Sequence, residues 1–155
     1  MDENMLNRTG VYIAYPTSPT LKSIYRPKNY KTKVNDQHTK IGIAKNNFKS
    51  RKSDYLGNFD NEVEFMPVVL IAPEFLEAIE KSIVSVLCSN FRRVGRTEWF
   101  CTTDRRRISE IIVKTLVESG IEHEYVGNFA LKRTHQSCAL PVRLASEEEQ
   151  IGATH

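Results

Sequence analysis

Three short apolar runs, rich in β-branched and aromatic residues, lie in the first half of the chain, and such runs are typical of strands. They cover residues 10–15 (GVYIAY), 40–44 (KIGIA) and 64–72 (EFMPVVLIA). The third run is apolar enough for a central strand. Pro67 within it cannot donate a ladder hydrogen bond, so we expect a bulge there or a strand that starts closer to Val68.

Two segments between and after these runs carry the signals of helix ends. Asn46 or Asn47 can cap a short helix that ends at about Tyr55, with Gly57 just beyond its end. A longer helix is expected over residues 73–91, because it would begin with a proline, which is favourable at the first helical position.

A third helix is expected in the second half of the chain, between two short extended segments. The first, residues 98–101 (EWFC), is expected to be extended, and the second, residues 121–126, is a candidate for one further strand. One of three adjacent polar residues can cap the helix, namely Thr102, Thr103 or Asp104. Its apolar stripe ends before Gly120 and consists of Ile108, Ile111, Ile112, Thr115 and Leu116.

Strands and helices are mixed in this order, which predicts an α+β fold with a small mixed or antiparallel three-stranded sheet flanked by helices. The 155 residues suffice for one domain, which we assign to residues 1–128, with its core at 10–103. Residues 16–38 are polar, contain three prolines and show no sustained period, so they are expected to form an inserted loop. Residues 129–155 are expected to form a C-terminal tail.

Composition narrows the class of protein further. Hydrophobic residues make up 40% and charged residues 26% of the chain, as in ordinary globular proteins. No apolar run is long enough to span a membrane, and the N-terminus lacks a signal-peptide pattern, so we expect a cytoplasmic protein. Cys88, Cys101 and Cys138 are scattered, which argues against a disulfide framework or a zinc knuckle. The histidines also lack the spacing of metal ligands.

Positive charge is concentrated in one stretch, although the net charge is only +3. Residues 21–52 contain ten lysines and arginines against a single acid, Asp36. Such a cluster can face the phosphates of a nucleic acid. From charge alone, a solvated loop and helix face explains it equally well.

The expected helix over residues 73–91 carries one acidic residue on its apolar side. At about 100° per residue, Glu80 points between the directions of Leu87 and Phe91. A carboxylate on an apolar face is costly unless it is paired, protonated or bound to a metal. Glu80 therefore either lies at the edge of this face, pairs with a buried arginine or has a functional role. The apolar arc itself consists of Phe75, Leu76, Ile79, Ile83, Val86, Leu87 and Phe91.

Arg51 and Tyr55 lie four residues apart on the expected short helix and so share one face of it. A guanidinium fork beside a phenol suits a phosphate and a water molecule. An ordinary surface arginine next to a core tyrosine would give the same spacing.

Taken in order, these elements resemble the GIY-YIG nuclease family. Residues 10–12 (GVY) are similar to its first signature and residues 40–42 (KIG) to its second, with Lys40 in the place of the usual tyrosine. Arg51 follows as that pattern expects, and Glu80 corresponds to the lone inward glutamate of the family's helix. Residues 96–100 (RTEWF) resemble a stretch found in a subgroup of phage and restriction-related proteins, which also commonly has KIG.

The resemblance covers roughly residues 10–103 and includes two departures. Between the signatures, 27 residues intervene, more than the family usually has, and they are rich in lysine. We interpret them as an inserted loop that grips DNA. Asn90 is only a loose counterpart of an asparagine that often follows the family's catalytic helix. Tyr55 agrees with GIY-YIG restriction enzymes that carry a lysine in the second signature and a tyrosine one turn after the arginine.

The resemblance implies an endonuclease that hydrolyses DNA phosphodiester bonds with Mg²⁺ or Mn²⁺ and without a small-molecule cofactor. Glu80 would be the single protein ligand of the metal, and Arg51 would bind the scissile phosphate. Tyr12 would act as the general base or relay to it, and Lys40 would either favour the phenolate of Tyr12 or contact the water directly. Tyr55 would position the water or the phosphate.

Double-stranded DNA is the expected partner, and cutting both strands at one position would favour a symmetric homodimer. The expected phosphate contacts come from the insertion, from the turn after the helix with Glu80, and from the start of the next helix. They are Lys22, Arg26, Lys28, Lys31, Lys33, Arg92, Arg93, Arg96 and Arg105, Arg106 and Arg107.

Two other functions remain compatible with the sequence. One is a catalytically inactive nucleic-acid-binding module of the same fold, against which the presence of Tyr12, Arg51 and Glu80 together argues. The other is a small protein-interaction domain with a basic face. DNA affinity that falls steeply with salt would count against that last reading.

Overall fold

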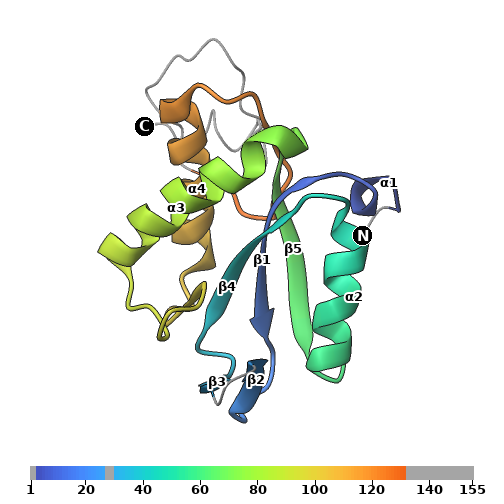
Figure 1. Ribbon diagram of the computed structural model, residues 1–155, viewed down its shortest axis with the longest axis vertical. Coiled ribbons are helices and arrows are strands. Elements are labelled where there is room, and N and C mark those ends of the chain that lie inside the picture. The colour runs from blue at the N-terminus through green and yellow to red at the C-terminus, as the bar shows by residue number, and fades with distance from the viewer. Residues whose placement is uncertain (1–2, 27–29, 132–155) are drawn as a thin grey trace.

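An antiparallel five-stranded sheet forms the centre of the computed structural model, which describes residues 3–26 and 30–131, with side chains 25–31 excepted (Figure 1). Its strand order is β6-β4-β1-β5-β7. The strands are β1 (Gly10–Pro16), β4 (Thr39–Ala44), β5 (Val63–Leu70), β6 (Trp99–Phe100) and β7 (Glu124–Tyr125). The α+β class is therefore confirmed.

The sheet has two more strands than the three expected from the sequence. The three expected strands are β4, β1 and β5, which lie together at its centre. β6 adds to the outer edge of β4 and β7 to the outer edge of β5, each through only two residues. β7 lies within residues 121–126, where one further strand was a candidate. For β6 the sequence indicated extended structure but not membership of the sheet, because a segment so short carries no detectable period.

Helices cover both faces of the sheet (Figure 1). α2 lies on one side, and α3 and α4 lie on the other, while the short α1 precedes β1. Their bounds are α1 (Glu3–Leu6), α2 (Phe48–Asn58), α3 (Leu76–Asn90) and α4 (Arg105–Ser119), with a 3₁₀ turn, η1 (Pro73–Phe75), leading into α3. The three expected helices are thus present.

Three of the helix ends form for the predicted reasons, but α2 continues to Asn58, so Gly57 lies within the helix and not beyond its end as expected. The Asn47 side chain accepts a hydrogen bond from the Ser50 amide at the start of α2. Asp104 does the same for the Arg107 amide at the start of α4. Gly120 ends α4 in the left-handed region at φ 67°, where glycine carries no Cβ penalty. Pro73 begins the 3₁₀ turn rather than the α-helix.

Pro67 lies next to a β-bulge, as predicted. Val11 pairs with Val69 and Tyr12 with Pro67, so Val68 is the additional residue on β5. The ladder is thus interrupted next to Pro67, the one residue of β5 that has no backbone N–H to donate.

The inserted residues contain a hairpin, where the sequence predicted a loop. β2 (Lys22–Arg26) and β3 (Tyr30–Val34) pair with each other in a separate two-stranded sheet. It lies at the end of the main sheet where β1 finishes and β4 begins (Figure 1). The prediction was wrong because a ribbon this exposed has no apolar alternation, apart from isolated residues such as Ile24 and Val34.

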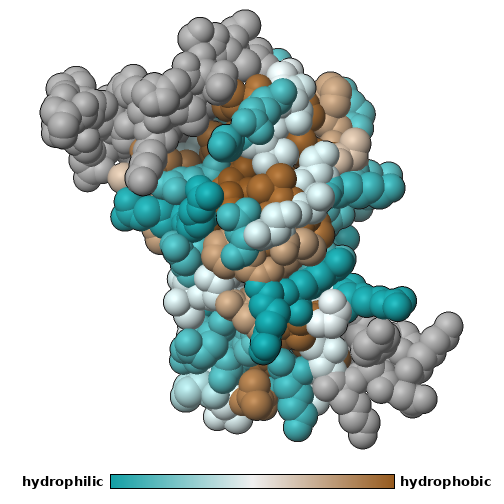
Figure 2. All heavy atoms as spheres, turned by 90° about the vertical axis from the view of Figure 1, so that its left-hand side faces the viewer, coloured by the Kyte–Doolittle hydropathy of each residue, from teal (hydrophilic) through white to brown (hydrophobic). Residues whose placement is uncertain are grey.

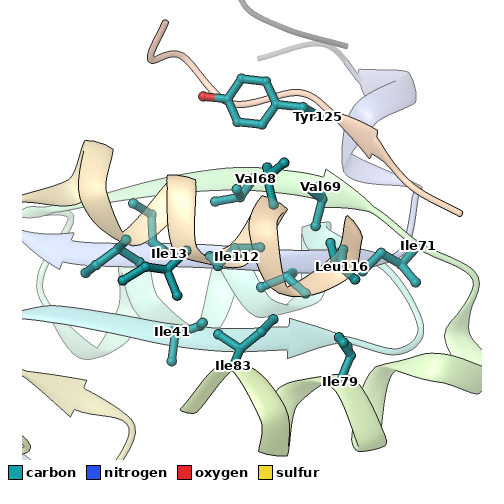
Figure 3. Close-up of a cluster of buried hydrophobic side chains, with 14 of the residues drawn as sticks. Ile13, Ile41, Val68, Val69, Ile71, Ile79, Ile83, Ile112, Leu116 and Tyr125 are labelled. Atoms are coloured by element: carbon teal, nitrogen blue, oxygen red, sulfur yellow. The ribbon is translucent and has the colours of Figure 1, made fainter. Parts of the chain in front are cut away.

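Strand alternation divides the interior into two cores. On β1, Val11 and Ile13 point to the core under α3 and α4, while Tyr12 and Ala14 point to the core under α2. Figure 3 shows the first core, in which side chains of α3 and α4 meet those of the three central strands. Tyr12 therefore belongs to the α2 side of the sheet.

The packed chain continues to the end of the described residues. Leu131 is buried in the first core, and the Tyr125 hydroxyl donates to the Phe129 carbonyl at 2.7 Å. The rest of the expected tail, residues 132–155, lies outside the described part.

No helix among the described residues is long and apolar enough to cross a membrane. On the side of α3 and α4, apolar and hydrophilic side chains are interspersed (Figure 2).

The packing of α3 predicts a sharp contrast between two of its residues. Ile83 is fully buried, whereas Val86 is 39% exposed. We expect Ile83→Ala to lower the free energy of unfolding by roughly 2–4 kcal/mol through lost burial and a cavity. Val86→Ala should change it by less than about 0.5 kcal/mol. Urea unfolding followed by circular dichroism measures both, and equal losses would contradict this packing.

Candidate active site

Tyr12 is the buried centre of the side chains that the sequence singled out. Its side chain is only 3% exposed, and its hydroxyl lies 2.9 Å from the Tyr55 hydroxyl. The Tyr55 ring meets it edge-on, with centroids 5.6 Å apart, and the Phe65 ring packs against it at 4.6 Å. Because β1 and α2 supply the two hydroxyls, this hydrogen bond fixes the helix against the sheet.

Gly42 makes room for Tyr12. The two residues are directly paired between β4 and β1, and the Tyr12 ring leans across Gly42. A Cβ atom at position 42 would collide with the ring and hydroxyl of Tyr12. Gly10 is similarly constrained, because a Cβ there would collide with the Val69 carbonyl oxygen. The glycines of residues 10–12 and 40–42 therefore have steric reasons for being glycine.

Arg51 lies one turn before Tyr55 on α2, on the side that faces Tyr12. Burial raises the pKa of Tyr12 above its ordinary value. The hydrogen bond with Tyr55 and the positive charge of Arg51 act in the opposite direction but do not cancel the effect of burial on this pKa. Tyr12 is thus a neutral phenol with a cation beside it.

Glu80 reaches the same region from α3. It is half-buried, and burial raises the pKa of its carboxyl group, while the positive charges of Lys40 and Arg51 lower it. These mutual effects mean that the side chains of Lys40, Arg51 and Glu80 lie near one another, although they come from three elements. A second contact ties the start of α3 to this area, since Lys45 pairs with Glu77 at 2.6 Å, one turn before Glu80.

Lys40 is held in place by its surroundings. Its ammonium group donates to the Ile41 carbonyl at 2.8 Å and lies 3.5 Å from a Glu98 carboxylate oxygen. The other carboxylate oxygen of Glu98 lies 3.9 Å from the Arg93 guanidinium. The negative charge of Glu98 also raises the pKa of Glu80.

Glu98 is the site residue that the sequence analysis did not assign. It belongs to the RTEWF stretch, which was noted only for its resemblance. Glu98 lies beside Lys40 because β6 pairs with Thr39 and Lys40, and Glu98 directly precedes Trp99 of β6. That pairing joins residues almost sixty positions apart and could not be derived from local pattern.

A pocket of about 500 Å³ opens beside this cluster, between α2 and the β2–β3 hairpin. Three of the predicted catalytic side chains, those of Lys40, Arg51 and Tyr55, line one part of it. The remaining lining residues are Ser23, Ile24, Asp54, Asn58, Phe59 and Trp99. The pocket therefore gives a substrate access to the cluster.

The donor set fits a sparse magnesium site and not a closed metal cage. Within residues 3–26 and 30–131, no group of three or more histidine, cysteine, aspartate or glutamate side chains could hold a metal ion. Glu80 is a half-buried carboxylate near the pocket, whereas the carboxylate of Glu98 is flanked by two cations. Magnesium is often held by one or two carboxylates together with water and substrate phosphates. Glu80 meets that minimum.

The predicted phosphate contacts fall into three groups. Lys33, Arg92 and Arg96 are exposed. Lys22 pairs with Asp60 at 2.6 Å, and Arg93 donates to the Thr97 carbonyl as well as pairing with Glu98, so both are already engaged within the protein. The side chains of Arg26, Lys28 and Lys31 lie outside the described part.

The arginines at the start of α4 hold the protein together. Arg105 donates to the Thr39 hydroxyl at 2.8 Å and to the Asp36 and His38 carbonyls at 3.1 Å each. Its guanidinium also stacks 3.9 Å from the centre of the Tyr15 ring. Arg105 therefore anchors the start of β4 through three of its five N–H donors. Its two neighbours are likewise engaged, Arg106 with the Ala130 carbonyl and Arg107 with Glu110.

Comparison with known proteins identifies no relative of this chain. No family model, curated protein or solved structure matches it.

The close approach of Gly42 and Tyr12 predicts the effect of adding a single methyl group. We expect Gly42→Ala to displace the Tyr12 ring and to lower the free energy of unfolding by roughly 1–3 kcal/mol, as overpacking does. Gly57→Ala is the control, because nothing lies within 4 Å of a Cβ there, and it should be neutral or stabilising. Urea unfolding and near-UV circular dichroism measure these effects. Native behaviour of Gly42→Ala would show that Tyr12 does not lie across position 42.

Proposed function

We propose that this protein is a Mg²⁺- or Mn²⁺-dependent endonuclease that hydrolyses phosphodiester bonds of double-stranded DNA. One observation carries the proposal: five side chains from four separate elements gather in one region, and three of them, Lys40, Arg51 and Tyr55, line the same pocket. The five are Tyr12 of β1, Lys40 of β4, Arg51 and Tyr55 of α2, and Glu80 of α3. These are the residues to which the GIY-YIG resemblance gives catalytic roles.

Arg51 suits the binding of the scissile phosphate. It is exposed, lines the pocket, and makes no hydrogen bond or ion pair with another of the residues that the structure describes. Its planar fork matches two phosphate oxygens and can offset the charge that develops during attack. The nearby Tyr55 hydroxyl can donate to the same phosphate or to the attacking water.

Tyr12 is better suited to relaying a proton than to acting as a standing phenolate. Its raised pKa keeps the hydroxyl protonated at neutral pH. Across the 2.9 Å contact, the Tyr12 hydroxyl could accept the proton of the attacking water while passing its own proton to the Tyr55 hydroxyl, which would release its proton to solvent water in the pocket. Arg51 provides the positive charge that lowers the cost of transient negative charge on the phenol.

Glu80 would hold the metal ion, which when bound supplies charge stabilisation to the phosphate. Lys40 and Arg51 lower the pKa of Glu80 and so help to keep its carboxyl group ionised at neutral pH, against the effect of burial. Glu98 would act as a positioning residue, because it pairs with Lys40 without itself lining the pocket.

The choice of DNA as substrate rests on the resemblance together with the exposed cations. Lys33 belongs to the hairpin, and Arg92 and Arg96 to the turn before β6, and all three are available to phosphates. Such contacts provide affinity and little sequence information.

Conversion of supercoiled plasmid to nicked or linear DNA tests the proposal. We expect cutting with Mg²⁺ and none without it, and a loss of at least about 100-fold in Glu80→Gln, since the metal would lose its protein ligand. Glu77→Gln is the matched control, one turn earlier on α3 and exposed, and should cut at nearly the native rate. A Glu80→Gln variant that cuts as well as the native protein would show that this site is wrong. Binding without cutting by both proteins would favour an inactive nucleic-acid-binding module.

The pKa of Glu80 adds a dependence on pH. Because this pKa is raised, the folded protein holds the Glu80 proton more tightly than the unfolded chain does, so ionisation of Glu80 opposes folding as pH rises through the raised pKa. Glu80→Gln should therefore keep or raise the melting temperature at neutral pH while cutting is lost. In the native protein, cutting should fall on acidification at a higher pH than ordinary for a glutamate. A variant that is both inactive and less stable would indicate a structural role.

A further inference from the structure

We propose that the pocket between α2 and the β2–β3 hairpin holds the nucleoside that adjoins the scissile phosphate, an inference that rests on the proposed nuclease function. The pocket of about 500 Å³ is of the size that small-molecule ligands occupy in proteins. It extends away from the catalytic cluster, so a nucleotide whose phosphate lies against Arg51 would direct its sugar and base into it.

One face of α2 runs from the phosphate end of the pocket to its far end. Arg51, Asp54, Tyr55 and Asn58 all line the pocket, and their spacing of three, four and seven residues from Arg51 places them on one stripe of the helix. Arg51 and Tyr55 have roles in the proposed chemistry. Asp54 and Asn58 have none, yet they face the same space.

Asp54 and Asn58 offer the groups that recognise a base edge. Neither side chain makes a hydrogen bond or ion pair with another residue of the described part of the chain. A carboxylate accepts hydrogen bonds, and an amide both donates and accepts, so together they complement the mixed donors and acceptors of a nucleobase. A site for phosphate alone would have no use for the carboxylate.

The remaining walls are apolar. Phe59 and Trp99 pack against each other, with ring centroids 5.9 Å apart, and both contribute to the lining, although they are only 6% and 1% exposed and so offer the pocket little surface. Ile24 of the hairpin, which is half-buried, adds to this apolar wall, against which one side of a base can pack. The pocket thus combines a phosphate end, a polar wall and an apolar wall.

The hairpin forms the wall opposite α2. Ser23 and Ile24 of β2 line the pocket, and the neighbouring Lys22 pairs with Asp60, which follows α2, at 2.6 Å. The sequence predicted that Lys22 and the other inserted residues bind phosphates. In this proposal the hairpin instead forms one wall of the pocket next to the cluster.

Trp99 makes the proposal testable without metal or cutting, because it is the single tryptophan of the chain and lines the pocket. Each of the four deoxynucleoside 5′-monophosphates is titrated into the full-length protein with EDTA present, and tryptophan fluorescence is recorded with excitation at a wavelength that nucleotides absorb weakly. The probe without a base is 2-deoxyribose 5-phosphate. We expect saturable changes with at least one nucleotide and at least about tenfold weaker binding of the sugar phosphate. Equal responses to both would overturn the proposal.

Variants identify which wall binds the base. Asn58→Ala and Asp54→Ala should each raise the Kd of the nucleotide by roughly two- to tenfold, as the loss of one or two hydrogen bonds does. Ser53→Ala, on the opposite and exposed face of α2, is the control and should leave the Kd unchanged. Native affinity in both Asn58→Ala and Asp54→Ala would overturn the assignment.

The two proposals fail in different ways. If nucleotides bind as expected and plasmid is never cut, the nuclease function fails and the nucleoside pocket stands. If plasmid is cut and Glu80→Gln abolishes cutting, but the protein does not distinguish nucleotides from the sugar phosphate, the nucleoside pocket fails and the nuclease function stands.

Discussion

The hydrogen bond between the Tyr12 and Tyr55 hydroxyls fixes the geometry on which the proposed site depends. It joins the central strand β1 to α2 inside the second core, so α2 cannot shift without breaking a buried polar contact, which is costly. Once α2 is fixed, Arg51 lies beside Tyr12 and faces the pocket. Gly42 is the condition for this arrangement, because any side chain there would displace the Tyr12 ring.

Burial and positive charge oppose each other at this centre. Burial raises the pKa of Tyr12 and the pKa of Glu80. The positive charge of Arg51 lowers both pKa values, and the positive charge of Lys40 also lowers that of Glu80. Lys40 is held in place by the Ile41 carbonyl and Glu98, so it needs little reorganisation when a charged substrate arrives, which is how preorganised sites favour charge development. Glu98 serves the same end by pairing with Lys40.

The sequence predicted the parts of this molecule that depend on local chemistry. Asn47, Asp104 and Gly120 marked helix ends correctly, and the spacing of Arg51 and Tyr55 placed them on one helix face. What it could not predict depends on distant pairing: the addition of β6 to the sheet, the position of Glu98 beside Lys40, and the use of Arg105 as an anchor for β4. The β2–β3 hairpin was not predicted, because its strands bury too little apolar surface to show the two-residue alternation of a strand.

A double-mutant cycle on the rate of plasmid cutting tests most directly whether the tyrosine pair is the working centre. The variants are Tyr12→Phe, Tyr55→Phe and the combination, each of which removes a hydroxyl and keeps the ring. If the hydroxyls act as one unit, Tyr12→Phe should slow cutting by at least about 100-fold, and the double variant should be no slower than Tyr12→Phe alone. Losses that multiply in the double variant, or a native rate in Tyr12→Phe, would contradict this account.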